Sequence, residues 1–91
     1  MLMPNIRLRI ADEFSQGLSE IYSDNILKRI DRAIRNLMVF PEMGSPLVRP
    51  SLANRYGEGL RQIPIGTLLI IYKYDGTTID VLALVFGPSV I

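Results

Sequence analysis

The sequence contains no cysteine, no histidine and no tryptophan. Without cysteine the chain forms no disulfide and offers no thiolate nucleophile or cysteine-ligated metal. Without histidine it cannot by itself build a Ser-His-Asp triad or most transition-metal sites. Any catalysis would have to use carboxylates, lysine, arginine, tyrosine or hydroxyl side chains. We therefore expect no metal centre and no cofactor.

Long apolar segments are also missing. The longest continuous apolar run covers residues 81–86, whereas a membrane-spanning helix needs about 20 residues. Residues 1–10 already include two arginines and lack the apolar stretch of a secretory signal. These absences predict a soluble, cytoplasmic protein with no membrane partner.

An excess of one charge is lacking as well. Ten basic and nine acidic side chains leave a net charge of +1, so the overall charge does not call for a nucleic-acid partner. The 91 residues are 48% hydrophobic and 21% charged, which is typical of a folded chain rather than a disordered one. This length suits one modest core, and we predict a single domain over residues 1–91.

The N-terminal third shows two changes of hydrophobic period. Residues 6–10 alternate apolar side chains with arginines, which predicts a half-buried strand with one basic face. A short amphipathic helix should follow, with Asp12 as its N-cap and Gly17 weakening it by about 1 kcal/mol relative to alanine. Its apolar stripe consists of Phe14, Leu18, Ile21 and Tyr22.

The strongest helical pattern lies at residues 26–38, where apolar side chains recur at helical spacing. Acidic residues precede basic ones by four positions in the pairs Asp24–Lys28 and Asp31–Arg35, which stabilises helices. We interpret the opposite face as solvated rather than as a surface for an acidic partner. Its basic side chains are Lys28, Arg29, Arg32 and Arg35.

The second half begins with a loop at residues 41–59, rich in proline and glycine, within which residues 51–56 can form one helical turn after Pro50. Residues 60–63 then alternate imperfectly, as in a strand, and Pro64 and Gly66 mark a turn or an edge. Strong strand patterns occupy residues 67–74 and 78–86 around an Asp75-Gly76 turn. The last strand is almost entirely apolar, so we place it at the sheet centre. The predicted fold is α+β, with the order β-α-α-β-β-β and a helical hairpin packed on a small antiparallel sheet.

Three arginines form the first candidate site: Arg49, Arg55 and Arg61, opposed within that span only by Glu58. Guanidinium groups bind phosphates in bidentate fashion, so this series could hold a nucleic-acid backbone, although a solvated loop surface is the simpler interpretation.

Tyrosines form the second candidate site. Tyr56 is free to stack on a base or a target surface. Tyr72 and Tyr74 share a strand face with Ile70, and we expect them to pack between sheet and helix. The carboxylates form no metal-loop pattern.

Four segments, in order along the chain, resemble the RelE/ParE toxin superfamily of bacterial type II toxin–antitoxin systems. The helix end and loop at residues 35–46 resemble the pattern "L..FP.MG.P", and residues 59–66 resemble "GLR.lpvG". Residues 69–76 resemble the hairpin "viiYR.DG", and residues 79–87 resemble the closing strand "idil.v.hG". The resemblance covers nearly the whole chain in the same element order.

The resemblance implies a growth-inhibiting toxin of the kind that stabilises plasmids. It also implies a cognate antitoxin whose extended segment and helix wrap the toxin in a hetero-oligomer. RelE-like members cleave mRNA at the ribosome, whereas ParE-like members inhibit DNA gyrase.

The sequence departs from the RelE pattern at basic positions. Arg61 matches a basic position of the second strand, but Lys73 lies further along the third strand than the expected arginine, and residues 86–91 include no basic side chain and no tyrosine. Cleavage of RNA at its 2′-hydroxyl needs a base, an acid and charge for the phosphorane, and Arg61 and Lys73 supply only charge.

Our leading hypothesis is a ParE-like toxin that binds a target such as gyrase through Arg49, Arg55, Tyr56 and Arg61. One alternative is a RelE-like endoribonuclease with Arg61 and Lys73 as catalytic residues, assisted by Arg49 and Arg55. The other is a decayed, non-toxic member that still binds its antitoxin, an alternative prompted by the altered C-terminal residues.

Overall fold

The structure, a computed structural model, describes residues 5–90. Residues 1–4 of the N-terminal region and Ile91 of the altered tail lie outside the described residues. The α+β fold is confirmed, and the helical turn expected after the proline-rich loop is present as α3. The elements are β1 (Arg7–Ile10), α1 (Asp12–Ser19), α2 (Asp24–Leu37), α3 (Pro50–Tyr56), β2 (Leu60–Ile65), β3 (Leu68–Tyr74), β4 (Thr78–Phe86) and a short 3₁₀ helix (Gly87–Ser89).

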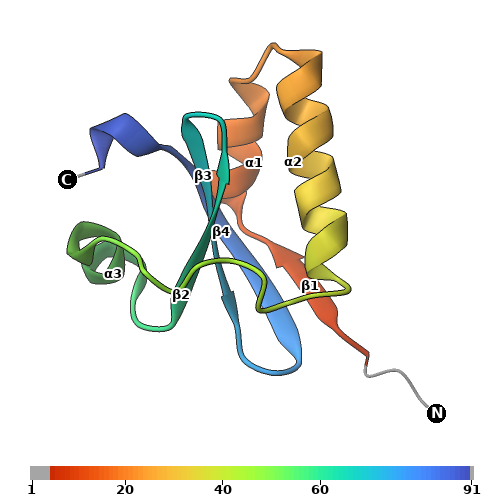
Figure 1. The fold of residues 1–91 in the computed structure, drawn as a ribbon, viewed down its shortest axis with the longest axis vertical. Coiled ribbons are helices and arrows are strands. Elements are labelled where there is room, and N and C mark those ends of the chain that lie inside the picture. The colour runs from red at the N-terminus through yellow and green to blue at the C-terminus, as the bar shows by residue number, and fades with distance from the viewer. Residues whose placement is uncertain (1–4, 91) are drawn as a thin grey trace.

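The sheet has the strand order β1-β4-β3-β2, as can be followed in Figure 1. The expected central place of β4 is confirmed, and the pairs β2–β3 and β3–β4 are antiparallel. β1 differs from the expectation, because it pairs with β4 in parallel, with Arg9 opposite Asp80. The sheet is therefore mixed. Parallel neighbours need a long connection, and here three α-helices and two other strands intervene.

Helices cover both faces of the sheet. On one face, which we call the hairpin face, α1 and α2 lie side by side (Figure 1) and bury Phe14 and Leu37 against Ile70 and Tyr72. On the other, the α3 face, Leu52 packs on a second apolar cluster. That cluster contains Leu60, Ile71 and Ala83, with Val85 and Val90 partly buried beside them. The alternation of side chains along β3 supplies both cores.

The first helix shows three differences from its sequence pattern. Its N-cap is Ala11, and no side chain caps it, because Asp12 is already helical and contributes its charge to the first turn. The helix ends at Ser19, so Tyr22 falls outside the stripe and is 93% exposed. A Cβ at Gly17 would lie 3.2 Å from the Leu84 Cβ. This glycine thus allows α1 to approach β4 closely.

The second helix follows its pattern more closely. Ile30, Ala33 and Leu37 are buried, and the Ser23 hydroxyl accepts the Ile26 N–H at the N-terminus. The predicted ion pair between Asp31 and Arg35 forms, with 2.9 Å between Oδ2 and Nε. Asp24 and Lys28, by contrast, do not form an ion pair. Both are exposed, and such pairs contribute little even when they form.

Candidate functional site

Arg61 is directed into the protein rather than toward a ligand. Its Nη1 donates to the carbonyl of Glu42 over 2.9 Å and to that of Gly44 over 2.7 Å. These acceptors belong to residues 41–45, which we call the clamped loop. Arg61 is partly buried and satisfies backbone carbonyls that no helix or strand uses. Because Arg61 belongs to β2, these hydrogen bonds hold the clamped loop against the sheet.

Tyr72 holds the same loop from the neighbouring strand. Its hydroxyl donates to the Pro41 carbonyl over 2.9 Å and accepts the Gly44 N–H over 2.8 Å. The side chain is fully buried, and this burial raises the pKa of its hydroxyl. Arg61 and Tyr72 are cross-strand partners in the β2–β3 ladder, so both side chains point to the hairpin face.

Lys73 lies on the opposite face of the sheet from Arg61. It follows Tyr72 on β3 and pairs with Leu60, whose side chain belongs to the α3-face core. Its ammonium lies near Gly57, where an added Cβ would be 2.8 Å from Nζ. The two residues expected to act together on a phosphate therefore point away from each other, with the sheet between them.

Arg55 and Tyr56 lie together, but with an acidic partner. Both contact the Glu13 carboxylate of α1, Arg55 through Nη2 over 3.3 Å and Tyr56 through its hydroxyl. The Arg55 guanidinium also lies 5.1 Å from the Tyr56 ring centroid, within cation–π range. Burial, followed by the hydrogen bond to Glu13, raises the pKa of Tyr56 to about 12. This cluster ties α3 to α1.

Arg49 is exposed immediately before α3 and makes no side-chain hydrogen bond or ion pair with any described residue. The four residues expected to bind a target thus separate into three places. Arg61 braces the clamped loop, Arg55 and Tyr56 share Glu13, and Arg49 faces solvent. The structure does not bring them together as one cationic site.

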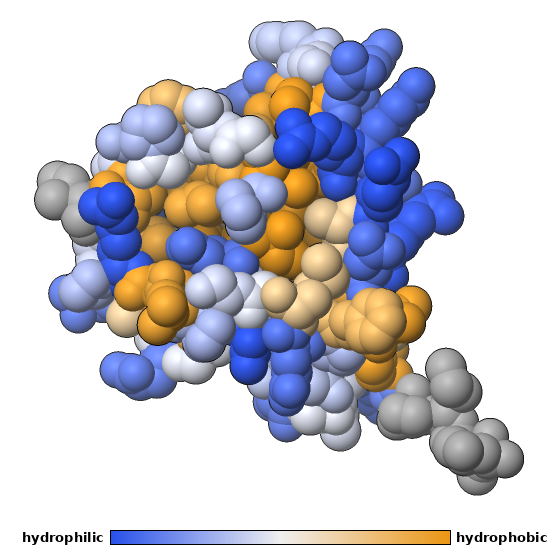
Figure 2. Space-filling view, in the orientation of Figure 1, coloured by the Kyte–Doolittle hydropathy of each residue, from blue (hydrophilic) through white to orange (hydrophobic). Residues whose placement is uncertain are grey.

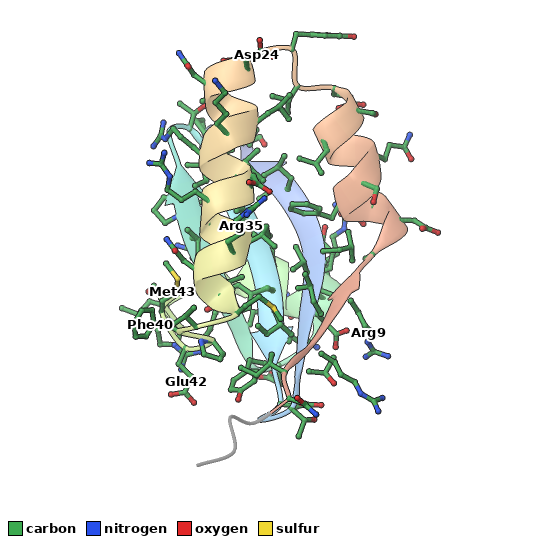
Figure 3. The ribbon with its side chains drawn as sticks, turned by 90° about the vertical axis from the view of Figure 1, so that its right-hand side faces the viewer. Arg9, Asp24, Arg35, Phe40, Glu42 and Met43 are labelled. Carbon is green, nitrogen blue, oxygen red and sulfur yellow. The ribbon has the colours of Figure 1, made fainter. Side chains whose placement is uncertain are left out.

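An apolar groove lies between β1, α1 and α2, with a volume of about 300 Å³. Leu8 and Ile10 of β1 form its outer side and remain 38% and 41% exposed. Figure 3 shows α1 and α2 side by side, with β1 continuing from the lower end of α1. Its lining consists of Leu8, Ile10, Phe14, Leu18, Leu27, Ile30, Asp31 and Ile34.

The two edges of the sheet are not equivalent. On β2, Pro64 has no N–H to offer, and Gln62 exchanges two backbone hydrogen bonds with Ser45 of the clamped loop. On β1, residues Arg7 and Ala11 donate inward to β4, so the backbone groups of Leu8 and Ile10 point outward. An open edge is a site where another chain can add a strand.

A second apolar surface lies where α2 meets the clamped loop. Val39, Phe40 and Met43 are 64%, 66% and 46% exposed, and we call these three residues the apolar tip. Together with Pro41, Glu42 and Tyr74 they line a pocket of about 530 Å³. From the sequence, we interpreted these residues only as a helix end and the start of a loop. A run of large apolar side chains continuing past the last buried turn was the available signal.

Two further features are absent from residues 5–90. Their aspartate and glutamate side chains do not gather in threes as a metal site would require. Within the same residues, each helix is too short or too polar to cross a bilayer.

The layered arrangement of a helical hairpin on a four-stranded sheet is the one that the resemblance to RelE/ParE toxins predicted. A family model described as the ParE toxin of the type II toxin–antitoxin system parDE matches residues 8–85. The chain belongs to this family and is a toxin of a type II toxin–antitoxin system, which implies an antitoxin as partner. A comparison with curated proteins found no match.

Proposed function

We propose that this toxin, folded as one domain over residues 1–91, arrests bacterial growth by binding a cytoplasmic target such as DNA gyrase and does not cut RNA. The observation that carries the proposal is the placement of Arg61 and Lys73 on opposite faces of the sheet. A phosphorane needs its cationic groups converged on one phosphate. Membership of the ParE family supports the same choice. Plasmid stabilisation is the expected biological consequence.

The proposal includes neutralisation by a cognate antitoxin that covers the apolar groove. A segment lying along β1 would pair with the outward backbone groups of Leu8 and Ile10 and bury their side chains. The apolar lining of the groove supports a partner with an apolar face, such as an amphipathic helix.

The target is tested by inducing this chain in bacterial cells and pulse-labelling DNA and protein synthesis over the first minutes. We expect DNA synthesis to fall first, and purified toxin to inhibit gyrase supercoiling in vitro. An earlier fall in protein synthesis, with cleaved mRNA at ribosomes, would replace this proposal with the ribonuclease alternative. Unchanged growth with soluble expression would identify a non-toxic member.

The antitoxin surface is tested with Ile10→Glu, which places a charge in the groove at an exposed position. We expect this variant to remain toxic when co-expressed with the cognate antitoxin, because the complex no longer forms. Tyr22→Glu is the matched control, since Tyr22 is 93% exposed and lies outside the groove. If the antitoxin neutralises both variants equally, the groove is not its binding site.

A further inference from the structure

Exposed apolar side chains are concentrated in one short segment. Nine large hydrophobic residues within residues 5–90 are exposed, and five of them lie within residues 38–47. Figure 2 shows an apolar area at the C-terminal end of α2, where this segment begins. Single exposed apolar residues are ordinary, but a contiguous group marks an interaction surface. The five are Met38, Val39, Phe40, Met43 and Leu47.

The backbone beneath the apolar tip is held by hydrogen bonds from the sheet. Tyr72 binds the loop at Pro41 and Gly44, and Arg61 binds it at Glu42 and Gly44. The tip adds its own turn, in which the Met43 N–H donates to the Phe40 carbonyl over 3.0 Å. A surface held in this way loses little conformational entropy when a partner binds, which favours affinity.

The charge at the tip is a carboxylate without a partner. Figure 3 shows Phe40, Glu42 and Met43 projecting from the loop below α2, and the Glu42 side chain makes no hydrogen bond or ion pair with any described residue. Arg35 of α2 is paired with Asp31, and Arg61 binds loop carbonyls instead of this carboxylate. An apolar pocket beside a free carboxylate is complementary to an apolar side chain flanked by a basic one.

We propose that the apolar tip is the surface by which the toxin contacts its protein target, and that the target presents an apolar side chain beside a lysine or arginine. The inference rests on the proposed function, namely action by binding a target. The tip is separate from the groove assigned to the antitoxin, since the two linings share no residue. Target binding and antitoxin binding are therefore separable by substitution.

The test compares four variants of the full chain with the wild type in matched pairs. Phe40→Ser removes an aromatic ring from the tip, and Tyr22→Ser removes one from the exposed α1–α2 turn. Glu42→Lys reverses the charge at the tip, and Glu20→Lys makes the same charge change at another exposed position. Thermal unfolding checks that each variant folds. Potency is measured as the inducer level that stops growth and as inhibition of purified gyrase.

We expect Phe40→Ser and Glu42→Lys to lose at least about tenfold in potency, the effect of losing one interface hot spot. The two controls should stay within about twofold, and every variant should still bind the antitoxin. Full potency of both tip variants overturns the inference while the proposed function stands. Loss for Phe40→Ser alone overturns the assignment of a basic target. Loss of antitoxin binding by the tip variants assigns the tip to the antitoxin instead. A wild type without effect on growth or gyrase overturns the proposed function, and the inference with it.

Discussion

Gly44 and Tyr72 are 28 positions apart in the chain, yet the Gly44 N–H donates to the buried Tyr72 hydroxyl over 2.8 Å. The same hydroxyl donates to the Pro41 carbonyl, so one side chain satisfies both ends of a tight loop. Through this contact the sheet determines where the apolar tip stands. The stability of the fold and the presentation of the tip therefore depend on the same atoms.

Removing the hydroxyl tests this dependence. Tyr72→Phe leaves the Gly44 N–H and the Pro41 carbonyl without their partner, and we expect the free energy of unfolding to fall by about 1–3 kcal/mol. Urea denaturation measures the change. Tyr74→Phe is the control, because its exposed hydroxyl binds only the Gly76 carbonyl, and its loss should remain below about 1 kcal/mol. Equal losses of unfolding free energy in the two variants would show that the buried hydroxyl stabilises the fold no more than the exposed one.

Gly44 has no room for a side chain. An added Cβ would lie 2.6 Å from both the Tyr72 hydroxyl oxygen and its Cε1 atom, and 3.0 Å from the Gln62 carbonyl oxygen. We expect Gly44→Ala to destabilise the fold by about 1–3 kcal/mol, because the ring is enclosed and the carbonyl is part of the backbone. Thermal denaturation beside Glu42→Ala, an exposed site in the same loop, measures the effect. A melting temperature equal to that of the control contradicts the prediction.

Substitution of Arg61 distinguishes a structural role of this residue from a catalytic one. Its two hydrogen bonds to carbonyls predict that Arg61→Ala lowers the free energy of unfolding by about 1–3 kcal/mol. If Arg61 were catalytic instead, Arg61→Ala would abolish RNA cleavage and leave the free energy of unfolding unchanged. Chemical denaturation combined with an RNA-cleavage assay separates the two. Unchanged stability with abolished cleavage would restore Arg61 as a catalytic residue.

The raised pKa of Tyr56 predicts that the fold loses stability at high pH. Its pKa is raised from 10.0 to about 12, so the folded state favours the neutral phenol. That contribution is complete below the unfolded value of 10.0 and is lost as the pH rises toward about 12. The stability of the wild type relative to Tyr56→Phe should therefore decline across this range. Denaturation at several pH values measures the difference, and a constant difference would contradict the raised pKa of Tyr56.

The lowered pKa of Asp75 predicts that the fold loses stability at low pH. Its carboxylate accepts the Thr77 and Thr78 N–H groups in the β3–β4 turn, and these bonds hold its pKa below the ordinary 3.8. The stabilisation is present above 3.8 and is lost as the pH falls through the lower folded value. Asp75→Asn should therefore differ most from the wild type near neutral pH. Acid titration of both proteins by circular dichroism checks this convergence.

Periodicity was sufficient for most of the fold. The strong strand pattern in residues 67–74 and the apolar run in residues 78–86 predicted both central strands. The parallel pairing of β1 was not predictable, because alternation gives the faces of a strand but not its neighbour or direction. Tyr22 was misplaced since its spacing continued the stripe of a helix that ends at Ser19. Local spacing says little about where a short helix stops.

The site was less predictable than the fold. Arg61 is tied down by the carbonyls of Glu42 and Gly44, and backbone acceptors leave no mark in a sequence. Glu13 was set aside among carboxylates without a pattern, yet it pairs with Arg55 across 42 positions. A side chain's charge is visible in the sequence, but its partner depends on how the layers meet. For this reason the candidate residues, which the sequence suggested as one cationic site, lie in three separate places in the structure.

The parallel pairing of β1 with β4 also affects how the toxin is made. Arg9 and Asp80, joined across these strands, are 71 positions apart. Synthesis runs from the N-terminus, so β1 and the helical hairpin leave the ribosome long before the strand that they pack against. The hairpin-face core cannot close until residues 78–86 have emerged, and pairing over such a separation is slow. The toxin therefore acquires its folded surfaces only after β4 has been synthesised, and an antitoxin that is already present can meet the chain as it folds.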